Sequence, residues 1–164
     1  MKFIRNTIFF KIFIILIIFI LDRVSKIYII NLFDGSQVNE IYLLDFINIY
    51  FIWNEGIAFG LLSFNDQYIY EIITLIIIII SIIILILSIK TKNYTSYFFA
   101  SIFGGALGNL YDRIKFSAVP DFIDLHIGNY HWFIFNVADI FITLGIFCLI
   151  FDELFRNKKN NEKN

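Results

Sequence analysis

Four long apolar stretches constrain this chain more than any other feature. They cover about residues 8–30, 68–89, 94–114 and 131–154. Each is long enough to cross a hydrocarbon core of about 30 Å, which takes roughly 20 helical residues. Because 59% of the 164 residues are hydrophobic and only 16% are charged, a soluble domain could not cover this apolar surface. The sequence therefore predicts an all-α polytopic membrane protein, with one domain of four transmembrane helices over residues 1–155.

The first stretch also has an alternative interpretation as a cleaved signal peptide, since Lys2 and Arg5 precede it. No small-x-small cleavage site follows, and the apolar run continues into "LDRVSKIYII". A first membrane span is therefore favoured.

The segment between the first two spans, about residues 31–67, is predicted to form a small extended platform. Branched and aromatic residues predominate in "DFINIYFIWNEGIAFG", and "NEG" breaks the run. An ordinary loop with interfacial aromatic residues is the alternative. Residues 156–164 are too polar to pack and are predicted to be a disordered cytoplasmic tail.

The basic residues predict the orientation in the membrane. With four spans, nine of them fall on one side and four, Arg23, Lys26, Arg113 and Lys115, fall on the other. The positive-inside rule then places both termini in the cytoplasm. Most acidic residues fall on the outer side, so we expect any chemistry near the outer face.

Composition also limits the classes of ligand. A net charge of −1 gives no field that would attract nucleic acid. The single cysteine, Cys148, excludes an internal disulfide and is interpreted as a small core residue. Two histidines, His126 and His131, are too few for a histidine-based metal site, and we interpret both as interfacial. We therefore expect no metal and no cofactor.

Polar residues interrupt the first and third apolar stretches. Asp22 and Lys26 are spaced i, i+4, so they share a helix face and can neutralise each other, whereas Arg23 is expected to snorkel to the interface. Gly104 and Gly108 form a small-xxx-small face that lets another helix approach.

A polar stripe continues from that glycine face toward the outer end. Asn109 and Arg113, one turn apart, offer donors to a carbonyl, a carboxylate or a lipid phosphate. Asp112 is expected to pair with the neighbouring Arg113. Pro120, the only proline, should start a new chain direction at Asp121, at the outer mouth of the bundle.

An aspartate within the fourth stretch is the most demanding feature. Asp139 is predicted to lie two turns into the span, with Asn136 and Thr143 on the same face, and a carboxylate at that depth costs several kcal/mol. The chain has no H-E-x-x-H or G-x-S-x-G motif. Two close carboxylates can share a proton and activate water, which is aspartyl peptidase chemistry, and Asp121 is the sensible partner. A non-enzymatic transporter or assembly factor that uses Asp139 for protons or packing is the alternative.

Five blocks in order resemble one family. "LDRVSK", "WNEGIAFG", "GGALGNLYDRI", "VPDFIDL" and "FNVADIFITLG" are similar to the signature blocks of lipoprotein signal peptidase (signal peptidase II, aspartyl peptidase family A8). The resemblance spans about residues 21–145. Pro120 departs from it, because the family usually has an aliphatic residue there.

The resemblance implies a hydrolase of the bacterial cytoplasmic (inner) membrane. It implies removal of the signal peptide from diacylglyceryl-modified prolipoproteins, before the lipidated cysteine, with membrane lipids as the other partner and a monomer as the expected state. It makes Asp121 and Asp139 the catalytic pair, and Asp22 and Lys26 supporting residues. The residues that it implies for substrate binding are Asn54, Gly56, Asn109, Arg113 and Asn136.

Overall fold

The computed structural model describes residues 2–36, 40–56, 67–128 and 130–161. Parts of the predicted platform, residues 37–39 and 57–66, lie outside this range. The described elements, in chain order, are α1 (Lys2–Phe33), β1 (Glu40–Leu44), β2 (Ile47–Asn54), α2 (Gln67–Lys90), α3 (Thr95–Phe116), β3 (Val119–Ile127), β4 (Tyr130–Phe135) and α4 (Val137–Asn161). The predicted combination of four helices with a small sheet is thus found.

Helix α3 occupies the centre of the bundle and packs against α1, α2 and α4. Its glycines make these approaches possible. A Cβ atom on Gly104 would lie 3.1 Å from the Cβ of Ile18 in α1, and one on Gly108 would lie 2.5 Å from Oδ2 of Asp22. The predicted close approach to this glycine face is confirmed, and α1 is the helix that makes it.

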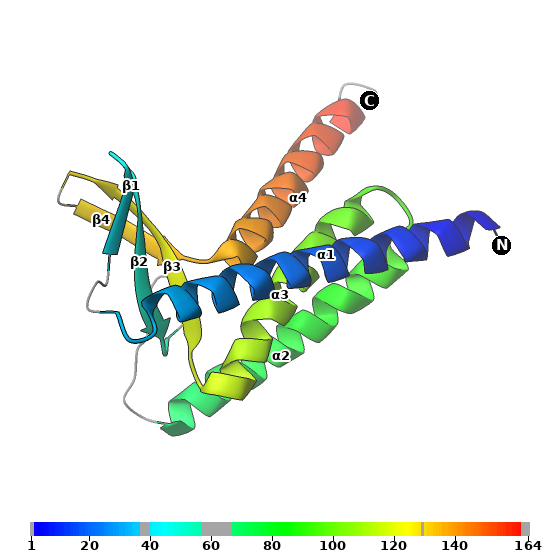
Figure 1. The fold of residues 1–164 in the computed structure, drawn as a ribbon. Helices are drawn as coiled ribbons and strands as arrows, with labels where there is room; N and C mark the ends of the chain where they lie inside the picture. The colour runs from blue at the N-terminus through cyan, green and yellow to red at the C-terminus, as the bar shows by residue number, and fades with distance from the viewer. Residues whose placement is uncertain (1, 37–39, 57–66, 129, 162–164) are drawn as a thin grey trace.

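The sheet lies at one end of the helices (Figure 1). The N-terminus, the turn between α2 and α3, and the C-terminal end of α4 lie toward the other end. Helix α4 diverges from α1 and α2 toward its C-terminus. One end of the bundle therefore carries the sheet and the other carries the two chain ends.

The sheet is antiparallel throughout, with the order β1-β2-β3-β4. Strand β3 pairs with β2 through Trp53 and Pro120, and with β4 only from Ile123 onward. Pro120 therefore lies where β3 has a single neighbouring strand, so its missing N–H does not remove a bond from the β4 side.

The outer surface of the helices is apolar, whereas charged groups lie inside. Phe9 on α1, Ile89 on α2 and Phe147 on α4 are more than half exposed. Asp22 and Lys26 are completely buried. Apolar side chains on the outside and charged groups on the inside are the reverse of the usual arrangement in water, and they suit a lipid environment. By length and composition alone, one described helix, Tyr68–Lys90, is long and apolar enough to cross a membrane.

Two sequence predictions about the last segment are wrong. The predicted span 131–154 began too early, because residues 130–135 form β4 and the helix starts at Val137. Apart from His131, the strand sequence "YHWFIF" is aromatic or aliphatic, so hydropathy does not separate it clearly from the helix that follows. Residues 156–161 continue α4 in place of the predicted disorder. Asp139 consequently lies in the first turn of α4, not two turns inside a membrane helix.

The prediction of an extended platform was correct, but it included only half of the sheet. Strands β1 and β2 lie between α1 and α2, as predicted. The other half of the sheet, β3 and β4, comes from the connection between α3 and α4, where no strand was predicted. The sheet therefore joins two segments that are distant in the sequence.

We predict that Gly105→Ala lowers the thermal unfolding temperature in detergent more than Gly104→Ala. A Cβ atom on Gly105 would lie 2.5 Å from the carbonyl oxygen of Ala138, a backbone atom that cannot rotate away. Overpacking of this kind costs about 1–3 kcal/mol. Both variants gain about 1 kcal/mol of helix propensity, so their difference reports the clash. Equal unfolding temperatures would contradict the close α3–α4 contact.

Candidate active site

Strand β3 and the start of α4 bring Asp121 and Asp139 to one site. Asp121 is the third residue of β3, and strand β4 returns the chain antiparallel to β3 before α4 begins. Asp121 is buried at 2% exposure. The two aspartates, predicted as a pair, are therefore close in space although 18 positions apart in the sequence.

Asn136 and Asp139 cap the first turn of α4 reciprocally. The Asn136 side-chain oxygen accepts the backbone N–H of Asp139 at 3.2 Å, and the Asp139 carboxylate accepts the backbone N–H of Asn136 at 3.1 Å. This is a capping box built from Asn and Asp. A carboxylate is also favoured there by the positive end of the helix dipole. The spacing that had been interpreted as a polar stripe is a helix start.

Asn136 also contacts the other aspartate. Its side-chain N–H donates to Oδ1 of Asp121 at 2.6 Å, and Asn54, at the end of β2, donates to Oδ2 of Asp121 at 2.8 Å. Each oxygen of Asp121 thus accepts an amide hydrogen bond. One residue, Asn136, bonds both carboxylates and fixes their relative position.

Asn109 of α3 connects Asp139 to a buried ionic cluster. Its side-chain N–H donates to Oδ1 of Asp139 at 2.8 Å, and its oxygen accepts a hydrogen bond from Lys26 at 2.7 Å. Lys26 also contacts Asp112 at 2.8 Å and Asp22 at 3.0 Å. The three donors of the Lys26 ammonium are therefore all used, and the predicted pair of Asp22 and Lys26 is confirmed.

Asp22 ties α1 to the start of α4. Its Oδ1 accepts the backbone N–H of Ala138 at 3.1 Å, which is one of the first-turn N–H groups that no carbonyl of α4 can satisfy. The carboxylate lies against Gly108 of α3, where a larger residue would collide with it. Asp22 thus positions the helix that carries Asp139.

Two sequence predictions about arginine partners are wrong. Arg23 does not snorkel away, because its guanidinium bonds both oxygens of Asp112 and one oxygen of Asp22. Asp112 accordingly pairs with Arg23 and Lys26 and not with Arg113. A cation on α1 could not be matched with an anion on α3 from helix spacing alone, because the pairing depends on how the two helices pack.

Arg113 instead holds the segment after β2. It donates to the carbonyl oxygen of Gly56 at 2.6 Å, while the Gly56 N–H donates to the side-chain oxygen of Asn54 at 2.9 Å. The other terminal nitrogen of Arg113, Nη1, is buried and has no hydrogen-bond partner among the described residues. The side chains of Asn54 and Arg113 and the backbone of Gly56, predicted from separate blocks, are therefore in contact as one group.

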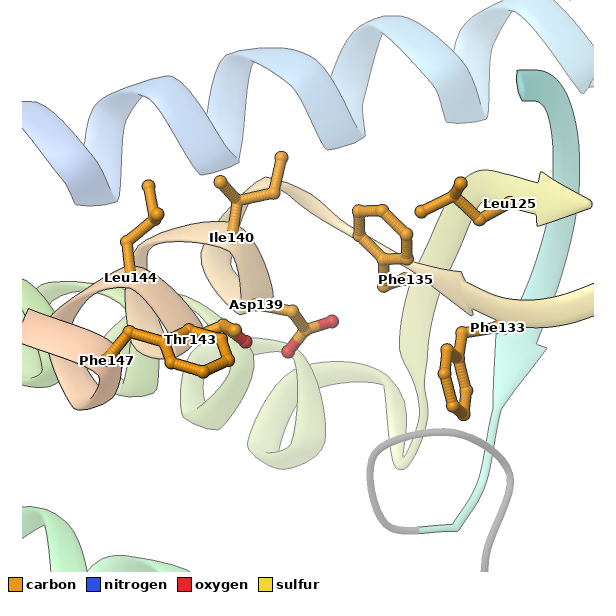
Figure 2. Close-up of a pocket in the computed structure, with 8 residues that line it drawn as sticks. All are labelled: Leu125, Phe133, Phe135, Asp139, Ile140, Thr143, Leu144 and Phe147. Carbon is orange, nitrogen blue, oxygen red and sulfur yellow. The ribbon is translucent and has the colours of Figure 1, made fainter. Parts of the chain in front are cut away.

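An apolar groove opens beside Asp139. Its volume is about 360 Å³, and Figure 2 shows the Asp139 carboxylate pointing into it. Thr143, one turn further along α4, is its other polar side chain. The remaining lining residues come from the sheet and from α4 and are Leu125, Phe133, Phe135, Ile140, Leu144 and Phe147. The groove can accept an extended apolar ligand and present it to a carboxylate.

Burial, and to a smaller extent the nearby charge of Asp139, raise the pKa of the Asp121 carboxyl from 3.8 to about 6. The amide hydrogen bonds from Asn54 and Asn136 oppose this shift without cancelling it. A carboxyl that keeps its proton to this pH, next to a second carboxylate, is suited to acid–base chemistry.

The histidines differ from the sequence interpretation. His126 is buried at 7% exposure, so it is not interfacial, and it lies with the exposed His131 beside the buried Asp124. No role for this cluster was predicted from the sequence. Only the pairing of β3 with β4 brings the two histidines together.

Comparisons with known proteins point to one family. A family model described as signal peptidase (SPase) II matches residues 14–155. The lipoprotein signal peptidase of Pelagibacter ubique (strain HTCC1062) is 54% identical, with 92% of each chain covered. That of Anaplasma phagocytophilum (strain HZ) is 40% identical over 88% of this chain and 92% of the relative. A solved structure described as a bacterial membrane enzyme is similar with a TM-score of 0.72 and 34% identity, covering 92% of this chain and 90% of that one.

We predict that the raised pKa of Asp121 makes stability fall as pH rises. The folded protein holds this proton up to about pH 6, whereas an ordinary aspartate loses it near 3.8. The folded state therefore binds more protons between these values, and the contribution of Asp121 to stability decreases as pH rises through this window. Asp121→Asn should remove this slope from the unfolding temperature measured in detergent at a series of pH values. Asp34→Asn, at an exposed position, is the control and should keep it; identical slopes in wild type and Asp121→Asn would contradict the shift.

Proposed function

Because the chain belongs to the signal peptidase II family, we propose that Asp121 and Asp139 are the catalytic pair of this aspartic endopeptidase. It removes the signal peptide from diacylglyceryl-modified prolipoproteins, cleaving before the lipidated cysteine. The observation that carries the assignment is Asn136, whose hydrogen bonds join the two carboxylates. The transporter or assembly-factor alternative has no such specific support.

The chemistry follows from two carboxyl groups that share one proton. The ionised group removes a proton from a water molecule, whose oxygen attacks the scissile carbonyl carbon. The protonated group donates its proton to the carbonyl oxygen, which stabilises the tetrahedral intermediate. When the C–N bond breaks, the carboxyl that received the water proton passes it to the leaving amine, and one hydroxyl group of the intermediate returns its proton to the other carboxylate, so that the pair again shares one proton. A pKa of about 6 at Asp121 keeps the shared proton available near neutral pH.

The hydrogen-bonded residues around the pair have separate roles. Asn109 bonds both Asp139 and Lys26, so it orients the carboxylate. Asp22 and Lys26 support it by holding α1, α3 and the start of α4 together. Asn136 positions both aspartates. None of these groups needs a second chain, so a monomer is sufficient for the reaction.

The substrate is held on both sides of the pair. The groove lined by Phe133, Phe135 and Phe147 accepts apolar parts of the substrate. The group formed by Asn54, Gly56 and Arg113 binds its peptide backbone. Nη1 of Arg113, which has no hydrogen-bond partner in the described part of the chain, supplies a buried donor for a carbonyl oxygen. A buried donor without a partner is costly, and a bound substrate would satisfy it.

We predict that Asp121→Asn and Asp139→Asn each lower the cleavage rate of a lipid-modified prolipoprotein by at least about 100-fold, the usual scale of a lost acid–base group. Asparagine is also a good helix cap, so α4 should still form in Asp139→Asn. The measurement is the mobility shift of the substrate on a gel, with purified enzyme in detergent. Asp34→Asn, far from the pair in the sequence and exposed, is the matched control. Full activity in either pair variant would disprove the assignment.

The same assay separates the lipid requirement from the peptidase reaction. A non-lipidated version of the substrate should be cut much more slowly, because it lacks the acyl chains that the groove would accept. Equal cleavage of both substrates would support the assignment as a peptidase and contradict the lipid requirement. Cleavage of neither by folded enzyme would favour the non-enzymatic alternative.

All four helices are proposed to span the cytoplasmic membrane, with the sheet and the aspartates at the outer face. The shortest, α3, has 22 residues, which is about 33 Å of helix. Nine of the thirteen basic residues lie at the end of the bundle opposite the sheet or in the tail. The positive-inside rule supports placing that end in the cytoplasm.

We predict that a fluorescent protein that folds only in the cytoplasm will be fluorescent when fused after residue 164. Alkaline phosphatase, which is active only outside the cytoplasm, should be inactive at the same position. Fusions of both reporters after Lys92, in the turn between α2 and α3, should behave in the same way. Phosphatase activity at either position would contradict the proposed orientation.

A further inference from the structure

We propose that Asp124, His126 and His131 form a binding site for a divalent ion of the zinc class, separate from the aspartate pair. The carboxylate and the two imidazoles offer three ligand atoms that all lie within 4.8 Å of one another. Two of these residues, Asp124 and His126, come from β3, and His131 comes from β4. Nothing in the proposed peptidase reaction uses them.

The pairing of the two strands creates the cluster. His126 and His131 are directly opposite each other in the sheet, and their rings stack with centroids 5.4 Å apart. Nδ1 of His131 lies 2.7 Å from Oδ2 of Asp124, and Nδ1 of His126 lies 3.7 Å from the same oxygen. Ligands of a tetrahedral zinc ion are roughly 3.3 Å apart, given zinc–ligand bonds of about 2.0–2.1 Å. Small movements of the side chains therefore suffice to admit an ion.

The buried atoms of the cluster have too few charge and hydrogen-bond partners among the described residues. The Asp124 side chain is only 1% exposed, and its ion-pair partners within the described part of the chain are the two histidines. Its Oδ1 and the Nδ1 of the 9% exposed His126 side chain are both buried without a hydrogen-bond partner. Buried polar atoms are nearly always satisfied. A single cation between the three side chains would balance the carboxylate and use the unpartnered imidazole nitrogen.

The donor set selects the kind of ion. Two imidazole nitrogens and one carboxylate suit Zn²⁺ and its first-row neighbours, whereas Mg²⁺ and Ca²⁺ prefer oxygen ligands. The His131 side chain is 52% exposed, so an ion can enter from the surface and a water molecule can complete the coordination. Three protein ligands and water are a common zinc arrangement.

The site is on the opposite face of β3 from the groove. Side chains alternate along a strand, so Asp124 and His126 share one face while Asp121 and Leu125 share the other. Leu125 lines the groove together with Asp139. An ion bound by Asp124 and His131 would therefore clamp the β3–β4 hairpin from behind and stiffen the strand that carries Asp121.

Calorimetric titration of the full-length protein, purified in detergent and stripped with a chelator, tests this proposal. We expect one equivalent of Zn²⁺ to bind and MgCl₂ to give no binding. His131→Ala should weaken Zn²⁺ binding by at least about tenfold, since a lost ligand should cost no less than a lost outer-shell partner. This side chain is half exposed, so the variant should fold. Tyr130→Ala, an exposed neighbour on β4 without a ligand atom of this kind, should bind as the wild type does.

His126→Ala gives a second, independent comparison. Its unfolding temperature shows whether the variant is folded, and a folded variant should also lose Zn²⁺ affinity. No binding by the wild type, or undiminished binding by His131→Ala, would overturn the proposal. In the first case, the cluster would be a simple hydrogen-bonded histidine–carboxylate group. The titration does not depend on peptidase activity, so its failure would leave the assignment of Asp121 and Asp139 untouched.

Discussion

The reciprocal hydrogen bonds between Asn136 and Asp139 are the contact on which the geometry of the site depends. They start α4: the Asn136 side-chain oxygen accepts the N–H of Asp139, and the N–H of Asn136 holds the Asp139 carboxylate, so N–H groups that no carbonyl of α4 can satisfy find partners. A charged group that would be costly in the middle of a membrane helix becomes favourable at the helix start. The same asparagine then reaches across to Asp121. The same residue, Asn136, thus both caps α4 and aligns the two acids.

Behind this contact, a buried cluster of charges keeps the helices in place. Arg23 and Lys26 on α1 face Asp112 on α3, and Asp22 bonds the backbone of Ala138 in α4. Two cations and two anions balance one another, which is how ionised groups can persist out of water. Because Lys26 also bonds Asn109, the cluster is linked to Asp139 by one intervening side chain. Rigid support of this kind is what a site needs when its geometry must be accurate.

The sequence predicted the four helices, the aspartate pair and most of their neighbours, because long apolar runs and ordered motif blocks are strong local signals. It misplaced the start of α4, since "YHWFIF" is mostly aromatic and aliphatic, like the helix that follows, and the hydrophobic period that separates strand from helix is lost there. Gly128, with a φ of +57°, marks the hairpin turn before this strand and was the available clue. The partners of Arg23 and the meeting of His126 with His131 depend on packing and strand register, which no local pattern encodes.

The division of the sheet between two distant segments has a consequence for biosynthesis. Strands β1 and β2 leave the ribosome early, but β3, β4 and the start of α4 follow only after α2 and α3. A nascent chain that ends after α3 contains neither of the two acids. The site that joins Asp121 and Asp139 can therefore assemble only when synthesis of the chain is nearly complete.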